Sequence, residues 1–399
     1  MKKKILSLLL TSALLTGGAA NVMADTDISV TVDGNAVAFT DVTPEIVDGI
    51  TYVPVRGVFD NIGAKVDYMD ETETVVIDCN NVNLRFVIGS NTVAVTKNNE
   101  TTNVTLDKAT YIKNDRTLVP FRFISETLGY DVDWDETSKT ASVTTNTRKA
   151  LDLINSFATG DTSVAENILT ENYIQHNLAY GTGRAAFIAS IEALASAPVK
   201  TTVNNVRAFS DGDYVFLQTV YNFAGAGEQV AFDIFRFENG KIAEHWDNLA
   251  AKAEPNPSGR TQIDGATEVK ELDKTEENKQ IAANFIKDVL VGENSDNLTS
   301  YFIGNEYIQH NTGIADGLDG LGAALAAYAE QGIEMIYTDT PIILGQGNFV
   351  LAASEGTLGG VPTAFYDMWR IENGKIIEHW DVIETIPDES TWANENGKF

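Results

Sequence analysis

The sequence predicts an α+β protein with a small α+β N-terminal module and two cone-shaped α+β domains, in which helices pack on a curved antiparallel sheet. Three observations predict this architecture. Two different sets of segments recur, at offsets of 66 and 134 residues, and within the longer repeat helical spacing comes first and strand-like alternation last. The 399 residues exceed one ordinary domain, and contents of 43% hydrophobic and 21% charged residues are typical of globular proteins.

The first 24 residues are typical of a secretory signal peptide. Three lysines follow Met1, an apolar run extends from Ile5 to Leu15, and small residues precede the expected cleavage point after Ala24. The run is too short for a membrane-spanning helix, which needs about 20 residues. We therefore expect an exported protein, either secreted or associated with the cell envelope.

The shorter repeat defines the N-terminal module, residues 26–145. Residues 52–56 (Tyr-Val-Pro-Val-Arg) recur as residues 118–122 (Leu-Val-Pro-Phe-Arg), and Gly63 recurs as Gly129. Each copy predicts a short helix after the proline, a glycine that ends it, and then two strands.

Residues 119–130 resemble the copper amine oxidase N-terminal domain family. The resemblance covers only this module, and such modules occur on many exported bacterial proteins without copper chemistry. The chain has no His-x-His pair and one cysteine, Cys79, so we expect no bound copper. The resemblance implies a spacer, or a module that contacts the cell envelope.

The longer repeat contains all four histidines. Residues 173–177 (Tyr-Ile-Gln-His-Asn) recur at 307–311, and the ten residues at 238–247 recur at 372–381 with one substitution. We expect two domains that arose by duplication.

The predicted domains are residues 147–253 and 276–387. The segment between them, 254–275, is rich in proline, glycine and charged residues, which is typical of a linker. We expect this linker to pack partly on the domain that precedes it.

The first domain shows the order of elements most clearly. Its predicted helices and strands are helices around 151–157, 164–169 and 185–195, and strands at 201–209, 214–223, 230–237 and 242–249. Three helices against a curved sheet enclose a pocket, so we expect a mostly apolar cavity in each cone.

A hairpin near the end of each domain carries the candidate chemistry. Asn239-Gly240 predicts a tight two-residue turn. Strict alternation would then leave His245 and Asp247 on the outer face of the sheet. One extra residue after Ile242, a β-bulge, would turn both side chains inward, and Trp246 would pack outward in an interface.

Residues 233–247 and their repeat at 367–381 resemble the SnoaL-like polyketide cyclase family of the nuclear transport factor 2-like superfamily. Members close rings by an intramolecular aldol condensation and use no cofactor, so we expect none here. The resemblance implies that Asp247 and Asp381 transfer the proton, and that the Tyr-Ile-Gln-His-Asn loops line the mouth of the cone. At the positions of Asp233 and Asp367 the family has a histidine, so this chain departs from the pattern.

The candidate site residues follow from the repeat and from this resemblance. The candidate catalytic residues are Asp247, Asp381, Asp233, Asp367, His176, His310, His245 and His379, and the candidate pocket-lining residues are Tyr173, Tyr307, Phe235 and Trp369.

Two carboxylates in an apolar cavity can separate in pKa, so that one serves as base and the other as acid. A histidine beside them titrates in the useful range. In the alternative interpretation, Asp233 pairs with Arg236 or with a buried tyrosine and has only a structural role. Two histidines and one aspartate per domain could also bind a metal ion, but nothing local enforces that geometry, so we expect no metal.

We expect cofactor-independent aldol condensation, cyclisation or isomerisation of a small apolar or carbonyl-containing compound. Two alternatives stay open: non-catalytic binding of a small molecule outside the cell, and a surface-associated structural protein. The net charge of −29 argues against nucleic acid as a partner, because an acidic surface repels phosphates.

Overall fold

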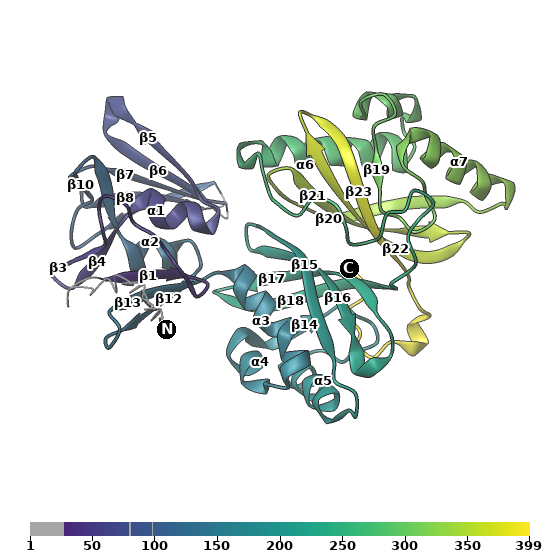
Figure 1. The fold of residues 1–399 in the computed structure, drawn as a ribbon, viewed down its shortest axis with the longest axis horizontal. Helices are drawn as coiled ribbons and strands as arrows, with labels where there is room; N and C mark the ends of the chain where they lie inside the picture. The colour runs from purple at the N-terminus through teal and green to yellow at the C-terminus, as the bar shows by residue number, and fades with distance from the viewer. Residues whose placement is uncertain (1–27, 80, 98) are drawn as a thin grey trace, which may run out of the picture.

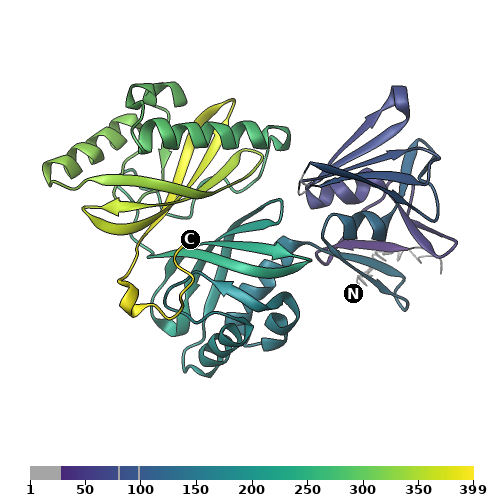
Figure 2. The same cartoon turned by 180° about the vertical axis from the view of Figure 1, so that it is seen from behind.

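The computed structural model describes residues 28–79, 81–97 and 99–399. The predicted signal peptide, residues 1–24, lies outside the described residues. The protein is α+β. An N-terminal module lies to one side of two larger sheet-and-helix bodies, as Figures 1 and 2 show from opposite sides.

The N-terminal module consists of three small sheets and two short helices around one apolar core. Its elements are β1 (Ser29–Val32), β2 (Asn35–Ala36), β3 (Glu45–Val47), β4 (Ile50–Pro54), α1 (Val55–Phe59), η1 (Asp60–Ile62), β5 (Lys65–Met69), η2 (Asp70–Thr72), β6 (Thr74–Cys79), β7 (Val82–Val87), β8 (Thr92–Lys97), β9 (Glu100–Thr105), β10 (Tyr111–Lys113), β11 (Arg116–Pro120), α2 (Phe121–Thr127), β12 (Asp131–Asp135) and β13 (Thr140–Thr144).

The two copies of the short repeat meet in the central sheet of this module. Strands β4 and β11 pair antiparallel, with Val53 opposite Val119, and each runs through a proline into its short helix. Gly63 ends the first helical segment with a φ of 77°, a left-handed conformation that glycine adopts without strain.

The second body, which we call the first cone, is a five-stranded sheet in the order β14-β18-β17-β16-β15 with helices on one face. Its elements are α3 (Asn146–Thr159), α4 (Thr162–Ile168), β14 (Leu169–Gln175), α5 (Arg184–Ser196), β15 (Thr202–Asp211), β16 (Tyr214–Asn222), η3 (Phe223–Gly225), β17 (Gln229–Glu238) and β18 (Lys241–Ala251).

The third body, the second cone, has the same strand order, β19-β23-β22-β21-β20. Its elements are η4 (Leu272–Lys274), α6 (Thr275–Phe285), the π-helical turn η5 (Ile286–Leu290), η6 (Ser295–Tyr301), β19 (Ile308–Gln309), α7 (Gly317–Glu330), β20 (Met335–Gln346), β21 (Phe349–Leu358), β22 (Val361–Glu372) and β23 (Lys375–Thr385), followed by η7 (Glu389–Thr391).

The predicted bulge is confirmed. Phe237 pairs with Ile242 and Arg236 with Glu244, so Ala243 is the extra residue in β18. Beyond it, side chains alternate: His245 and Asp247 lie on the helix-covered face, and Trp246 lies on the opposite face. The second cone has the same shift, between Arg370 and Ile371.

The two cones pack against each other through the sheet faces that their helices leave free. One apolar core, which we call the inter-cone core, contains side chains of both sheets, among them Phe232 and Trp246 from the first and Met368 and Trp380 from the second. Asn248 extends this contact, since its Nδ2 donates to two carbonyl oxygens of the second cone at 2.9 Å. The tryptophans thus pack outward into an interface.

Two segments outside the sheets reach from one cone to the other: part of the linker, and the residues that follow the second cone. We call residues 254–266 the first arm and residues 387–399 the second arm. Asn256 of the first arm donates to the carbonyl oxygens of Gln309 (2.7 Å) and Ile314 (2.9 Å) in the second cone.

The second arm makes the matching contact with the first cone. Asn394 donates to the carbonyl oxygens of Asn177 and Tyr180, both at 2.9 Å. Each arm therefore closes the loop of the opposite cone. The expected packing of the linker on the preceding domain is confirmed for its middle part, where Arg207 donates to the carbonyl oxygen of Ala266 at 2.6 Å and Gln218 to that of Gln262 at 2.9 Å.

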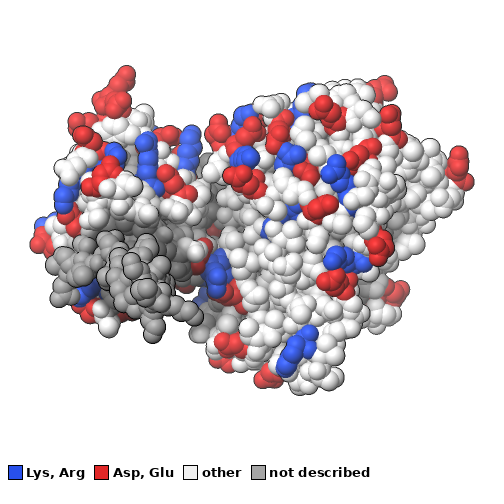
Figure 3. Space-filling model, in the orientation of Figure 1, with Lys and Arg blue, Asp and Glu red and all other residues white. Residues whose placement is uncertain are grey.

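Within the described residues, no helix is long and apolar enough to cross a membrane. On the face drawn in Figure 3, acidic and basic side chains are interspersed, and no large area carries a single sign of charge.

Candidate functional site

An aspartate–histidine–aspartate cluster lies on the helix-covered face of each sheet. Asp233, His245 and Asp247 form it in the first cone, and Asp367, His379 and Asp381 in the second. The hairpin places them: the two aspartates of each cone are directly opposite each other on neighbouring strands, and the histidine precedes the second aspartate by two residues. The structure thus brings together six of the eight candidate catalytic residues.

Each member of the first cluster has a polar partner. The His245 ring contacts Gln175 Oε1 through Nδ1 at 3.0 Å and Asp233 Oδ1 through Nε2 at 3.2 Å. Tyr221 donates its hydroxyl to Asp233 Oδ2 at 3.0 Å. Asp247 accepts a hydrogen bond from a neighbouring amide group on Oδ2, and its buried Oδ1 has no partner among the described residues.

The glutamine determines where the histidine carries its proton. Gln175 Oε1 already accepts from the backbone N–H of Asn177 at 2.9 Å, so the atom that faces the histidine is an acceptor. Nδ1 of His245 must therefore be the donor. Nε2 then faces a carboxylate oxygen, and that contact requires one proton, held either by the imidazole or by Asp233. His245 and Asp233 therefore share one proton between Nε2 and Oδ1.

The second cone repeats this geometry. His379 contacts Gln309 Oε1 and Asp367 Oδ1, both at 2.9 Å. Gln309 Oε1 accepts from a backbone N–H at 2.8 Å, which fixes the same tautomer. Tyr337 donates to Asp367 Oδ2 at 3.0 Å.

Burial shifts the pKa of carboxyl groups in both clusters. It raises the pKa of Asp233, against the hydrogen bond from His245. In the second cone, burial raises the pKa of Asp381. Burial disfavours the charged form of His379, but its hydrogen bond to Asp367 and the charges of both aspartates outweigh this and raise its pKa. A carboxyl group that gains basicity thus lies beside an imidazole that holds its proton more firmly.

The same three groups could hold a metal ion. In each cone, one ligand atom from each residue lies within 4.8 Å of the others. The amide that fixes His245 Nδ1 would then act as an outer hydrogen-bond partner of a metal ligand, an arrangement common in metal sites.

His176 and His310 lie apart from the clusters, on the opposite face of each sheet. His176 stacks on Trp246, with ring centroids 4.8 Å apart, and contacts Glu244 at 2.9 Å. His310 stacks on Trp380 at 4.7 Å and contacts Glu378 at 2.8 Å. The family resemblance predicts these histidines at the mouth of the pocket. The loops instead turn them toward the arms, where His176 Nδ1 contacts the carbonyl oxygen of Gly397 at 2.9 Å and His310 Nδ1 that of Thr261 at 2.8 Å.

The candidate pocket-lining residues surround the clusters. Phe235 stacks on His245 with centroids 4.5 Å apart, and Trp369 lies 5.7 Å from His379. Tyr307 contacts His379, and Tyr173 accepts a hydrogen bond from the side chain of Gln175.

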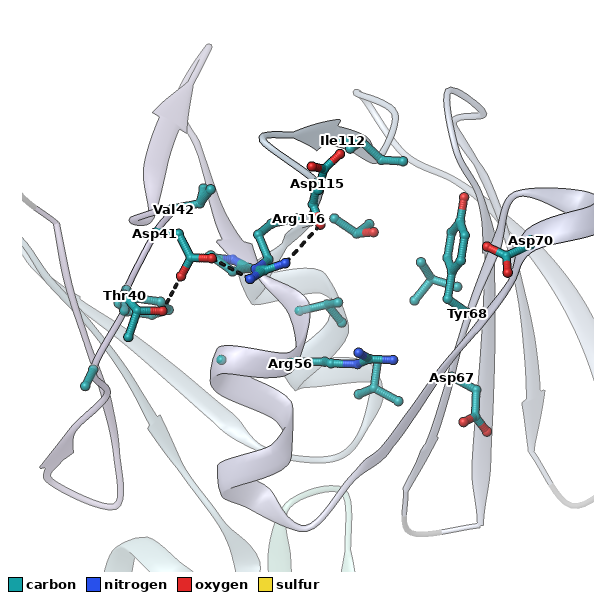
Figure 4. Close-up of a pocket in the computed structure, with 18 residues that line it drawn as sticks. Thr40, Asp41, Val42, Arg56, Asp67, Tyr68, Asp70, Ile112, Asp115 and Arg116 are labelled. Atoms are coloured by element: carbon teal, nitrogen blue, oxygen red, sulfur yellow. Dashed lines mark hydrogen bonds and ion pairs between the residues drawn. The ribbon is translucent and has the colours of Figure 1, made fainter.

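Cavities of ligand size lie elsewhere. In the second cone a largely apolar cavity of about 360 Å³ lies beneath α7. In the N-terminal module, a polar cleft of about 760 Å³ opens between α1 and β5. Figure 4 shows Arg56 and Tyr68 facing this cleft, while Arg116 is paired with Asp41 at its edge. The cleft lacks a buried acid–base group, so we do not take it as the catalytic candidate.

Sequence reasoning missed the partners of the clusters. Gln175 and Asn177 stand in the repeated Tyr-Ile-Gln-His-Asn segment, and their exact recurrence at 309 and 311 was a signal that could have identified them. Tyr221 and Tyr337 gave no such signal, because they come from different strands, β16 and β20.

Two of the three parts of the chain match known protein families. Residues 31–143 match the family described as "Copper amine oxidase N-terminal domain", and residues 150–245 match the family described as "SnoaL-like domain". No curated protein matches the chain.

The matches to similar solved structures each cover about a quarter of this chain. TsrD from Streptomyces laurentii is 20% identical, with 26% of this chain and 90% of that chain covered and a TM-score of 0.23. A putative polyketide cyclase from Bacillus cereus is 19% identical, with 26% and 72% covered and a TM-score of 0.23. An LEH-like epoxide hydrolase from M. tuberculosis is 15% identical, with 25% of this chain and 75% of that chain covered and a TM-score of 0.23.

Proposed function

We propose that this protein catalyses proton transfer next to the carbonyl group of a small molecule, without a cofactor, as in aldol condensation, cyclisation or isomerisation. One observation carries the proposal. A buried histidine and aspartate share one proton, and a second aspartate lies directly across the hairpin. Acid and base are thus available in one site.

The chemistry assigns a role to each group of the second cone. Asp381 takes the proton from the carbon next to the carbonyl; the C–H electron pair moves into the carbon–carbon bond, and the carbonyl oxygen becomes an enolate. The single proton of the His379–Asp367 pair is donated to that oxygen. Burial favours this assignment, since it raises the pKa of Asp381 and so makes it a stronger base.

A second candidate is metal-assisted chemistry at the same groups, favoured by the three ligand atoms within 4.8 Å. A divalent cation there would polarise the carbonyl oxygen. Adding Zn²⁺ or Mn²⁺ to chelator-treated protein distinguishes the two candidates, because a metal-dependent reaction would need the ion and the proton-transfer reaction would not.

The remaining parts fit an exported protein. We propose that the two cones are copies of one SnoaL-like domain, near residues 147–253 and 276–387, and that residues 1–24 direct export. The match of residues 31–143 to the copper amine oxidase N-terminal domain supports a role for this module outside the cytoplasm, in contact with the cell envelope. A tagged chain expressed with and without residues 1–24 and traced to medium or cytoplasm tests the export proposal.

The test of the proposed chemistry is hydrogen exchange at carbon. The protein is incubated in D₂O with a panel of small apolar ketones and β-diketones, and deuterium uptake beside the carbonyl is followed by NMR. We expect uptake above the buffer rate, and a loss of about 10²–10⁴-fold in Asp381→Asn, because the amide keeps the size of the carboxylate but cannot accept the proton.

The matched variant is Asp247→Asn in the first cone, and melting temperatures show whether each variant is folded. Uptake at the buffer rate across the whole panel, or equal uptake by the wild type and both variants, would remove the proposal. A variant that melts much earlier would instead identify the aspartate as structural.

A further inference from the structure

The two cones differ beneath their long helix, α5 in the first and α7 in the second. In the first cone Phe187 of α5 stacks on Phe157 with ring centroids 5.1 Å apart. Phe223 lies 5.9 Å from Phe157 and 4.8 Å from Tyr221. These four aromatic side chains fill the space between the helices and the end of the sheet.

The helices of the second cone carry smaller residues at the matching positions. Gly183 and Gly317 open the two helices with the same 2.7 Å hydrogen bond to the carbonyl of the tyrosine before them, so Phe187 corresponds to Leu321. The buried residues Ala150, Leu153 and Ile154 of α3 correspond to Ala282 and Phe285 of α6 and Ile286 of η5, so Phe157 corresponds to Val289.

The strands of the second cone also carry smaller side chains at the matching positions. Counted from the residue opposite the buried aspartate, Tyr221 of β16 corresponds to Gly356 of β21, and Phe223 corresponds to Leu358. Every member of the aromatic group therefore has a smaller counterpart.

The cavity of about 360 Å³ lies where those side chains are missing. Val289, Leu321, Leu325 and Met335 are among its walls, and most of its lining is apolar. Helix α7 packs loosely over it, and Leu325 is 42% exposed. The volume is at the small end of the range of about 300–1,000 Å³ that is typical of ligand sites.

Two of the residues that line the cavity connect it, through one further side chain each, to the acid–base cluster of the same cone. Met335 and Tyr337 are two residues apart on β20 and share a face, and the Tyr337 hydroxyl donates to Asp367. On the other side, the Phe285 ring in the cavity wall lies 5.8 Å from Trp369, which contacts His379.

The tyrosine itself has changed strands. In the first cone Tyr221 of β16 pairs with Val203, and in the second cone the matching pair is Gly356 with Tyr337 of β20. Both hydroxyls reach their aspartate at 3.0 Å. The second cone therefore keeps the tyrosine, on the neighbouring strand, and the side chains that become smaller are those at the positions of Phe157, Phe187 and Phe223.

We propose that the second cone is the ligand-binding cone, and that its cavity takes one compact, mostly apolar small molecule with a single carbonyl group, whereas aromatic side chains fill that space in the first cone. The apolar body follows from the cavity walls. The carbonyl group rests on the proposed function, because it would lie toward Tyr337 and Asp367.

The test uses 6-propionyl-2-(dimethylamino)naphthalene, a neutral, apolar fluorophore with one ketone. We expect one equivalent to bind per chain, with a blue shift of its emission. The double variant Val289→Phe/Leu321→Phe rebuilds the aromatic pair of the first cone and should weaken binding at least 10-fold. The matched change in the first cone, Phe187→Leu, should leave this site's affinity unchanged.

Melting temperatures identify folded variants. If the double variant does not fold, Leu325→Glu puts a charge at the exposed rim and should weaken binding by a similar factor. Absence of binding by the wild type, two equivalent sites, or unweakened binding by the folded filling variants would each overturn the proposal. Fluorophore binding without deuterium uptake would instead reject the proposed chemistry and leave this binding site standing.

Discussion

Gln175 and Gln309 restrict the chemistry that their histidines can perform. Each glutamine oxygen already accepts a backbone N–H, so it offers the imidazole an acceptor and never a donor. The neutral histidine is therefore held in one tautomer, with its free nitrogen toward the aspartate. A hydrogen bond of modest energy thus decides which atom of each cluster exchanges protons.

The tyrosine hydroxyls stabilise the buried carboxylates. We expect Tyr337→Phe to lower the free energy of unfolding by about 1–3 kcal/mol, because Asp367 Oδ2 would lose its donor inside the protein. Tyr301→Phe is the control, since it removes a similar bond to Asp288 at the surface and should cost little. Equal losses in urea denaturation for the two variants would contradict this expectation.

Protonation of His379 gives a second prediction. Its pKa is raised above 6.5 in the folded protein, so the folded state keeps a proton that the unfolded state releases. This contribution to stability is complete below pH 6.5 and is lost as the pH rises through the folded pKa.

We therefore expect the melting temperature to fall with rising pH just above pH 6.5, by about 2–4 °C for each 1 kcal/mol lost. His379→Gln should remove this fall. If both proteins show the same pH profile, His379 does not carry the effect.

Residue patterns predicted the geometry of the hairpin that carries each cluster. The Asn-Gly turn and the bulge followed from the hairpin sequence, and they place His245 and Asp247 on the inner face. His176 could not be placed, because the direction of a loop side chain depends on a packing partner, here Trp246 and the second arm, that no local pattern specifies.

At the scale of elements, the arms are the least expected feature. Asn256 and Asn394 occupy similar sequences, Asn-Pro-Ser-Gly-Arg and Asn-Glu-Asn-Gly-Lys, and each asparagine Oδ1 also accepts the N–H two residues later. Each side chain thus stiffens its own arm while it binds the loop of the other cone.

We predict that a substitution in either arm affects the loop of the cone that the arm contacts, and not the cone that precedes the arm. Asn394→Ala should speed amide hydrogen exchange at residues 177–180, in the first cone, and Asn256→Ala should do so at residues 309–314, in the second. Each substitution removes one side-chain donor that bonds carbonyl groups of the loop, so we expect a loss of about 1 kcal/mol for each hydrogen bond.

Hydrogen exchange read by mass spectrometry separates the two loops. Faster exchange in the cone that precedes the altered arm, with no change in the opposite cone, would show that the arms do not hold these loops.

The helices and antiparallel strands of the first cone lie close to their predicted ranges because their apolar spacing is regular. Strand β14 was missed: Leu169 follows a helix directly, and its partner β18 is about 70 residues away. Parallel pairing depends on such distant contacts, so a local pattern does not indicate it.

At the scale of the whole molecule, the cones share a core that the N-terminal module does not. The inter-cone core joins both sheets, whereas the core of the module contains only its own residues. We predict two thermal transitions in calorimetry, one for the module and one for the paired cones.

Two matched variants test this division. Phe232→Ala in the inter-cone core should cost about 3–5 kcal/mol and shift only the transition of the cones, and Leu84→Ala should cost about 2–5 kcal/mol and shift only that of the module. Two separate transitions for the first and second cones would contradict a shared core.

The repeats predicted the division of the chain, but not the way in which its parts assemble. The packing of the cones depends on the outer sheet faces, where Trp246 and Trp380 could equally have met another subunit. The linker composition gave no sign that an asparagine would enter the neighbouring cone.

The crossed arms also set the order in which the two cones can finish folding during synthesis. The second cone receives contacts from residues only 49–58 positions away, which already exist when its loop is made. The corresponding contacts of the first cone span 214–221 positions, so its loop stays open until residues 394–397 have left the ribosome. The cone made first is completed last. Until then its edge strand lacks the contacts of the second arm and stays open to pairing with other chains.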